Sequence, residues 1–369
     1  MGATGEVRMA KKLAFDRVLF TTVALLIFFG LVMVYSASAA IARERSPLVN
    51  PFLVKQALAA AVGLALMICL MHVDYRWLRR PAVVYGMLAV SVALLVGVLF
   101  SPQLNGTRRW FFLAGLSLQP SELAKLALVP FIAYQIDKKQ GAVNRPSLLV
   151  PVAAATALVS CLILFEPDMG TAVLLAGTAL LLVFLGGLSW SWVAGALALV
   201  PPLLWLLVMA EPYRRGRFAT FLDPERDPLG SGFQALQSLI AVGSGGLLGL
   251  GPGKSVQKLY FLPHPESDFI FSIVAEELGM VGAMAMVVTF AVFAWRGLRA
   301  GAKAPDLFGR YLGWGFTGIV VLQALLNVSV TVALLPTKGI PLPFISYGGS
   351  SLVVTLCACG VVLNISQHG

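Results

Sequence analysis

Ten long runs of apolar residues divide the chain, and they constrain its fold more than any other feature. A helix needs roughly 20 apolar residues to cross the hydrocarbon layer of a membrane. Of the 369 residues, 58% are hydrophobic and 12% are charged, whereas a soluble domain carries about 25% charged residues. The sequence therefore predicts one all-α domain over residues 1–369 that crosses a membrane about ten times. The runs lie near residues 18–39, 52–73, 81–100, 120–136, 147–165, 169–187, 190–210, 268–295, 309–334 and 346–366.

The basic residues between these runs predict which side of the membrane each loop faces. Loops rich in Lys and Arg stay in the cytoplasm. With a cytoplasmic N-terminus, fourteen basic residues fall in cytoplasmic segments and five in the short outer loops, namely Arg43, Arg45, Arg108, Arg109 and Lys338. We therefore expect both termini in the cytoplasm, a cytoplasmic tail over residues 1–17 and a large extracytoplasmic loop over residues 211–267. The net charge of +10 resides in loops beside the membrane, so no nucleic-acid partner is expected.

Two segments imitate other kinds of sequence. The N-terminal run after Lys11 and Lys12 resembles a secretory signal peptide, but it exceeds the usual apolar core of 7–15 residues. The glycine-rich stretch over residues 243–255, GSGGLLGLGPGKS, resembles a phosphate-binding loop. It has Leu248 where the first glycine of that motif belongs, and no strand precedes it. We expect its glycines to permit close backbone packing or a tight turn.

Asp268 is the first candidate catalytic residue. It lies where the eighth apolar run begins, after the long outer loop, in the stretch FLPHPESDFIFSIVAEELG over residues 261–279. One interpretation is a helix cap. The other is a carboxylate kept ionised by the helix N-terminus, which accepts a proton at neutral pH. Glu276 and Glu277 lie deeper in the same run, where an unpaired charge is costly, so we expect them to have partners or to face a polar cavity.

Five further charged residues fall at the predicted outer ends of the spans. Glu122 and Lys125 are three residues apart, so they can pair on one helix face and line a polar cleft. Asp168 begins the sixth run, where a helix cap is the alternative, and Arg109 beside Trp110 could simply reach the membrane interface. Lys338 is the single charge in the last outer loop, where it could bind an anionic head group.

At these residues the chain resembles the SEDS family (shape, elongation, division and sporulation), a family of polytopic peptidoglycan glycosyltransferases. The resemblance extends over nearly the whole chain. Within the family, LPTKG around Lys338 resembles the division branch, FtsW, more than the elongation branch, RodA, whereas PLPFISYGGSS fits RodA equally well. The matching motifs are RRW at 108–110, QPSELAK at 119–125, EPDMGTA at 166–172, GSGGLLGLG at 243–251, SDFIFSIVAEELG at 267–279 and LPTKGIPLPFISYGGSS at 335–351.

This resemblance implies an inverting polymerisation of lipid II, the undecaprenyl-pyrophosphoryl disaccharide-pentapeptide, at the outer face of the bacterial cytoplasmic membrane. It places the catalytic aspartate of the family at Asp268, although Ser267 stands where the family usually has Thr. Candidate substrate-binding residues are Arg109, Glu122, Lys125, Asp168 and Lys338. The implied partners are a class B penicillin-binding protein and other division or elongation membrane proteins. A divalent cation is possible at such a site, and a lipid II flippase or a non-catalytic division scaffold are the alternative functions.

The charge asymmetry yields a topology prediction. In a background without native cysteines, Gln140→Cys and Glu225→Cys should react with an impermeant thiol reagent from opposite sides of sealed vesicles. Reaction of both from one side would contradict the ten-span arrangement.

Overall fold

The computed structural model describes residues 14–45, 49–103, 107–113, 116–140, 142–210, 212–223, 227, 230, 232–259 and 261–369. Within these residues the chain forms twelve α-helices, one 3-10 helix and one two-stranded antiparallel sheet. The elements are α1 (Arg17–Arg45), α2 (Pro51–His72), η1 (Tyr75–Arg79), α3 (Pro81–Val98), β1 (Phe111–Leu113), β2 (Leu116–Leu118), α4 (Pro120–Lys138), α5 (Pro146–Phe165), α6 (Met169–Leu185), α7 (Trp190–Met209), α8 (Pro212–Leu222), α9 (Phe233–Ser244), α10 (Ile270–Ala302), α11 (Leu307–Thr331) and α12 (Gly349–Ser366).

Each predicted apolar run contains one helix, which confirms an all-α, multi-pass membrane protein. The helices are α1 to α7 and α10 to α12. Among the described residues, seven helices are both long and apolar enough to cross a membrane, and apolar helices at Met169–Leu185 and Trp190–Leu203 are shorter. The remaining helix, α4, carries four charged residues, Glu122, Lys125, Asp137 and Lys138. The number of ten spans therefore stays a prediction.

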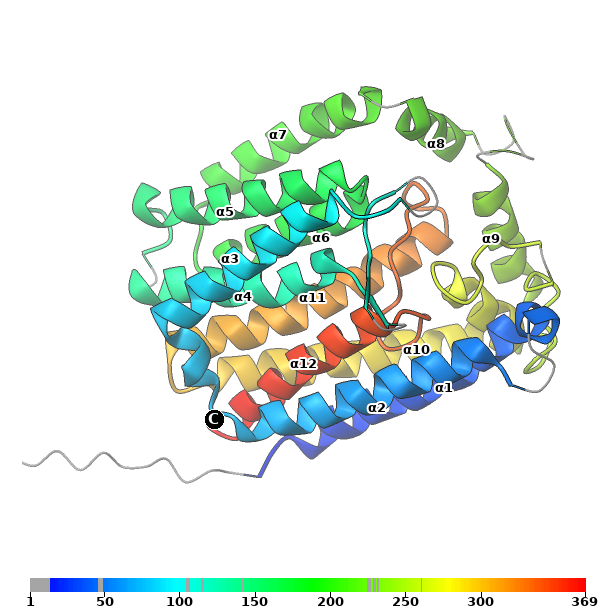
Figure 1. Ribbon diagram of the computed structural model, residues 1–369, viewed down its shortest axis with the longest axis horizontal. Coiled ribbons are helices and arrows are strands. Elements are labelled where there is room, and N and C mark those ends of the chain that lie inside the picture. Colours follow the sequence, from blue (N-terminus) through cyan, green and yellow to red (C-terminus); the bar gives the residue numbers. More distant parts are fainter. Residues whose placement is uncertain are drawn as a thin grey trace, which may run out of the picture.

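The long helices run beside one another, and α11 lies near the middle of the bundle (Figure 1). It packs against α4, α6, α10 and α12, while α12 packs most extensively on α2. Small residues allow close helix approach in membrane bundles. At Gly360 of α12, for example, an added Cβ would lie 2.6 Å from the Met67 carbonyl oxygen of α2. The helix α7 lies at the edge of the bundle (Figure 1).

The two ends of the bundle carry different segments. At the end near the C-terminus, Arg79 pairs with Asp137 at 2.7 Å, and Arg76 with Asp306 at 3.4 Å. These residues belong to segments predicted to be cytoplasmic. The helices α8 and α9 lie at the opposite end (Figure 1). The structure thus separates the predicted inner and outer segments, whereas the sidedness itself stays a prediction.

The predicted outer loop at residues 211–267 contains two helices, α8 and α9. The sequence predicts a helix from Phe233 to Val242 that lies along the membrane surface, and α9 confirms the helix. It runs across the direction of the long helices (Figure 1). The sequence did not predict the hairpin of β1 and β2, in which Phe112 pairs with Ser117. Of the predicted tail at 1–17, residues 1–13 lie outside the described residues.

The helix α10 is interrupted at Gly279, whose φ is 66° and ψ is −167°. The glycine-rich segment supplies the hydrogen bonds that the interruption leaves unmade. Leu250 and Gly251 donate their backbone N–H groups to the carbonyls of Glu276 and Glu277, both at 3.0 Å. In the other direction, Met280 donates to Gly246 O at 2.9 Å and Val281 to Leu247 O at 3.1 Å. The expectation of close backbone packing is confirmed.

The interruption predicts that Gly249→Ala and Gly279→Ala destabilise the protein. Both positions have φ near +60° to +80°, and an added Cβ would lie 2.2 Å from Glu277 O at Gly249 and 2.3 Å from Gly249 N at Gly279. We expect a loss of about 1–3 kcal/mol for the backbone conformation and more from the overlap, measured as a lower Tm in detergent. The control is Gly86→Ala in α3, where an added Cβ meets nothing within 4 Å. An equal Tm change in all three variants would contradict this account.

Candidate functional site

A cavity of about 480 Å³ lies at the end of the bundle where α8 and α9 are found. Its walls come from the segment before β1, the turn between α5 and α6, the helices α8 and α9, and the two segments that precede α10 and α12. Four predicted site residues line this cavity: Arg109, Asp168, Asp268 and Lys338. Thr107, Trp110, Arg217, Gln234 and His264 also line it. Residues as far apart in the sequence as Thr107 and Lys338 thus converge on one cavity.

Asp268 lies two residues before α10, and its carboxylate does not cap that helix. The cap residue is Phe269, and no side chain makes a capping hydrogen bond there. The side chain of Asp268 is only half-buried, and it faces the cavity. Gly339 lies directly against it, since a Cβ at that position would be 2.9 Å from Asp268 Oδ2. The capping interpretation of Asp268 is therefore wrong, and its carboxylate is available to a ligand.

Burial, more than any charge, sets the protonation of Asp268. Desolvation raises the pKa of this carboxyl to about 6, with Glu266 and Asp168 adding to the rise while His264 and Arg217 oppose it. The carboxyl is therefore mostly ionised at pH 7. A base whose pKa lies close to the working pH is well suited to proton transfer. The sequence predicts that the helix N-terminus controls this group, but the enclosing walls of the cavity do so.

Arg109 is held at the cavity by main-chain carbonyl groups. Its Nε donates to Glu166 O at 2.8 Å, and its Nη2 donates to Pro167 O at 2.5 Å. The Glu166 carboxyl is fully buried, and burial, then Asp168, raises its pKa to about 8 against the effect of Arg109. Glu166 is thus mostly neutral at pH 7. The positive charge of Arg109 remains largely uncompensated by this neighbour.

Two further cations reach the cavity from other elements. Lys338 lies with its Nζ 2.9 Å from Met169 Sδ, a weak acceptor that leaves the ammonium charge in place. Arg217 of α8 donates from Nη1 to Thr337 O at 2.9 Å, so it contacts the residue just before Lys338. Arg217 is not predicted from the sequence, because nothing in its local sequence separates it from the other basic residues of the long loop.

Asp168 combines both interpretations made from the sequence. It caps α6, where it accepts hydrogen bonds from Thr171 N at 3.1 Å and Thr171 Oγ1 at 2.8 Å, and Gln119 Nε2 lies 3.3 Å from it. Its side chain lines the cavity, although the residue is only 4% exposed. The predicted cap is confirmed, and this carboxylate contributes negative charge to the wall.

Glu122 and Lys125 are not among the residues that line this cavity. They form the predicted pair on one face of α4, with Lys125 Nζ 2.7 Å from both carboxylate oxygens of Glu122. Both are buried, and Lys125 also donates to Gln323 Oε1 at 2.7 Å. Gln323 in turn donates to Pro341 O at 2.8 Å. Through Gln323, the pair therefore supports the loop that carries Lys338. The pair itself lies inside the bundle, where the surrounding helices enclose it.

Asn327 of α11 joins the two segments that present Asp268 and Lys338. Its Nδ2 donates to Asp268 O at 2.9 Å and to Ile340 O at 2.7 Å. The side chain is 1% exposed. Asn327 is not among the residues predicted from the sequence. Its signal was a polar side chain inside an apolar run, four residues after Gln323, which places both on one helix face.

Glu276 and Glu277 have the partners that the sequence analysis expected. Glu277 accepts from Lys258 Nζ at 2.7 Å, from Ser36 Oγ at 2.7 and 2.9 Å and from Gly253 N at 2.9 Å. Glu276 accepts from Ser255 Oγ, Val256 N and Gln257 N at 2.5, 2.9 and 3.3 Å. Both glutamates are 1% exposed. They anchor the glycine-rich segment, which continues into the chain that carries His264 and Asp268.

The role of Asn327 can be tested by replacing it with leucine, which keeps the size of the side chain and removes both hydrogen bonds. We expect faster amide hydrogen exchange over residues 264–269 and 336–341, because the two cavity segments lose their common donor. The control is Asn364→Leu, which removes a buried donor to Met71 O at the opposite end of the bundle. Unchanged exchange in the Asn327 variant would contradict the bridging role.

Comparison with known proteins places this chain in a family. The FtsW/RodA/SpoVE family of cell cycle proteins matches residues 16–369. The chain is 41% identical to a "Probable peptidoglycan glycosyltransferase FtsW" of Geobacter metallireducens, over 96% of this chain and 95% of that one. It is 39% identical to the "Stage V sporulation protein E" of Bacillus subtilis, over 97% and 98%.

Solved structures agree with this assignment. A chain from a study of "structural coordination of polymerization and crosslinking by a peptidoglycan synthase complex" is similar with a TM-score of 0.79 and 33% identity, over 96% of this chain and 98% of that one. The rod shape determining protein RodA of Thermus thermophilus is similar with a TM-score of 0.69 and 30% identity, over 96% and 97%. The SEDS resemblance inferred from six motifs is thereby confirmed, and the chain belongs to the FtsW/RodA/SpoVE family.

Proposed function

We propose that this protein is a peptidoglycan glycosyltransferase, which polymerises lipid II at the cavity that contains Asp268. Relatives about 40% identical over almost their whole length carry the name peptidoglycan glycosyltransferase. The observation that carries the site assignment is the half-buried Asp268 carboxylate, which does not cap a helix and shares one cavity with Arg109, Arg217 and Lys338. A base beside several cations suits a reaction between a sugar hydroxyl and a diphosphate-linked sugar.

In the proposed reaction, the 4-hydroxyl of an incoming lipid II attacks the anomeric carbon of the growing chain. Asp268 takes the hydroxyl proton as the new glycosidic bond forms, while the bond to undecaprenyl pyrophosphate breaks. Pyrophosphate needs charge stabilisation more than a proton, so one carboxylate suffices. Displacement in a single step inverts the anomeric centre, from an α-linked donor to a β-linked polymer.

Arg109 and Lys338 neutralise the leaving diphosphate in this proposal, and Arg217 joins them. Fixed cations lower the barrier most when they are already oriented before charge develops. Carbonyl groups hold Arg109 and Arg217 in place. Asp168 orients the turn that carries Arg109's acceptors, whereas Glu122 and Lys125 act as positioning residues behind the Lys338 loop.

Whether a divalent cation also takes part depends on the substrate. In the described part of the chain, no group of three or more His, Cys, Asp or Glu side chains is arranged to hold a metal ion. Asp168 and Asp268 both line the cavity, and Mg²⁺ is commonly bound by one or two carboxylates together with substrate phosphates. These residues therefore fit a cation delivered with the diphosphate, which would add charge stabilisation.

We further propose that the protein lies in the bacterial cytoplasmic membrane with ten spans and both termini in the cytoplasm. The segregation of basic segments to one end of the bundle supports this orientation. A class B penicillin-binding protein is the proposed partner, supported by the similarity to a chain studied in a peptidoglycan synthase complex. The enzyme would supply glycan strands for division or elongation.

The decisive experiment is glycan formation from labelled lipid II by Asp268→Asn in proteoliposomes. The asparagine keeps the shape of the side chain and removes the proton acceptor, and loss of a positioned base costs about 10²–10⁴ in rate. We expect that loss with little change in Tm. Asp74→Asn, at the opposite end of the bundle, is the control. Substantial polymer from Asp268→Asn would exclude it as the base, and transport of lipid II without polymer in the wild type would indicate a flippase.

The pH profile of the wild type reports the same group. Because the pKa of Asp268 is raised to about 6, the active carboxylate is lost as the pH falls through that value. We expect the single-turnover rate to rise between about pH 5 and 7 and then to level.

The cation role is tested by Lys338→Ala. We expect a higher apparent KM for lipid II and a weaker dependence of the rate on ionic strength than in the wild type, because one charge that attracts the diphosphate is gone. Lys55→Ala, an exposed residue of α2, is the matched control. Unchanged KM and turnover in the Lys338 variant would remove it from the site.

A further inference from the structure

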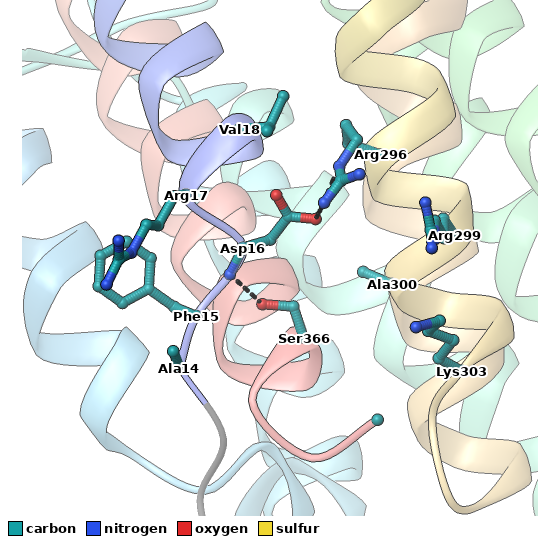
Figure 2. Close-up of a pocket in the computed structure, with 11 residues that line it drawn as sticks. Ala14, Phe15, Asp16, Arg17, Val18, Arg296, Arg299, Ala300, Lys303 and Ser366 are labelled. Atoms are coloured by element: carbon teal, nitrogen blue, oxygen red, sulfur yellow. Dashed lines mark hydrogen bonds and ion pairs between the residues drawn. The ribbon is translucent and has the colours of Figure 1, made fainter.

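A second cavity, of about 330 Å³, lies at the end of the bundle opposite to Asp268. It is formed where α1 begins, where α10 ends and where α12 ends (Figure 2). Cavities that bind small ligands are commonly about 300–1,000 Å³. The reaction proposed above uses no residue of this cavity, so its chemistry can be considered separately.

Basic side chains dominate the walls of this second cavity. Arg296, Arg299 and Lys303 follow one another at intervals of three and four residues, which places them on one face of α10. Figure 2 shows them in a row on the side of α10 that faces Asp16, whereas the side chain of Arg17 points away from them, toward Phe15. Among the described residues, Arg299 and Lys303 have no acidic partner within ion-pair distance. Two adjacent cations on a helix repel each other, so an anion between them is favoured.

Asp16 is the one acidic side chain that lines the cavity, and it is already bound. Its Oδ2 accepts from Arg296 Nε at 2.8 Å, and its Oδ1 accepts from Leu19 N at 3.0 Å, which caps the start of α1. Its backbone N–H donates to Ser366 Oγ at 3.1 Å. These contacts fix the two sides of the cavity relative to each other. The basic side chains of the cavity therefore outnumber its one acidic side chain.

Exposed apolar side chains lie at the cavity and next to its basic residues in the sequence. Val18, which lines the cavity, is 47% exposed, and Trp295, next to Arg296, is 59% exposed. The Trp295 ring centre lies 5.5 Å from Arg296 Cζ and 6.0 Å from Arg299 Cζ. Tryptophan in this setting is typical of the boundary between hydrocarbon and head groups. The cations are therefore placed at head-group depth.

We propose that this cavity binds the phosphate head group of an anionic phospholipid. The phosphate lies between Arg299 and Lys303, and the acyl chains lie along the surface of Val18 and Trp295. Basic pockets between membrane helices on the cytoplasmic side bind such head groups, and guanidinium groups bind phosphate oxygens in a bidentate manner. The apolar surface beside the cations favours a lipid over a soluble phosphate. The bound lipid joins α1 to α10 at this end.

The test measures lipid binding to the full chain in neutral detergent by native mass spectrometry. Phosphatidylglycerol is the anionic probe, and phosphatidylcholine with the same chains is the neutral one. Each basic group near an anionic lipid contributes about 1 kcal/mol, so we expect Arg299→Gln with Lys303→Gln to weaken phosphatidylglycerol binding tenfold or more. Binding of phosphatidylcholine should not change. The matched control is Lys138→Gln with Arg145→Gln, which removes two exposed basic residues from the same end outside the cavity.

A second variant makes the opposite prediction. Asp16→Asn removes the acid and keeps an oxygen that can accept from Leu19 N, so phosphatidylglycerol should bind several-fold more tightly. A misfolded protein would not bind the lipid more tightly, so a gain in affinity cannot come from misfolding. An unchanged or lower affinity would contradict the proposal.

Three results would overturn the assignment. The first is equal wild-type affinity for the two lipids, and the second is equal weakening by the control pair, which would indicate general surface charge. The third is full competition by inorganic phosphate at millimolar concentration, which would indicate a site for a free anion.

Discussion

The interruption of α10 at Gly279 is the constraint on which the site depends. A backbone group left without a hydrogen bond in a membrane costs several kcal/mol, so a helix can be broken there only if another segment supplies the missing partners. The glycine-rich segment does so through four hydrogen bonds. Only glycine allows the required approach, since a Cβ at Gly249 or Gly279 would overlap with backbone atoms. One irregular segment thus becomes part of the bundle, and it leads directly to Asp268.

The buried ion pairs of the bundle stabilise the fold, whereas the half-buried charges line the cavity together with the buried Asp168. Glu277 and Lys258 form an ion pair with side chains that are 1% and 6% exposed, and Ser36 and Gly253 complete the hydrogen bonds of the carboxylate. Glu122 and Lys125 are similarly enclosed. Breaking such a pair is costly because the remaining charge stays buried. Arg109, Asp268 and Lys338 keep part of their surface open to the cavity, which is what a charged ligand requires.

The two ends of the bundle carry basic residues for different reasons. At the Asp268 end, cations and carboxylates converge on one cavity, which suits a reaction on a diphosphate-linked sugar. At the other end, Arg17, Arg296, Arg299 and Lys303 outnumber Asp16 in a hollow beside exposed apolar surface. The count of basic residues in the sequence shows only which end of the bundle is rich in them and which is poor. The arrangement of the side chains distinguishes the proposed reaction site from the proposed lipid site.

The sequence by itself determined the helices, the segregation of charged loops, the family and the candidate Asp268. These features are local, because an apolar run of about 20 residues and a motif at its end require no knowledge of the neighbours. The tertiary structure alone decided that Asp268 is not a cap, that Arg217 reaches the cavity and that Asn327 joins its two segments. It also placed Glu122 and Lys125 behind the cavity wall. Each of these facts depends on contacts between residues far apart in the chain, where burial and hydrogen bonding act without leaving a periodic signal in the sequence.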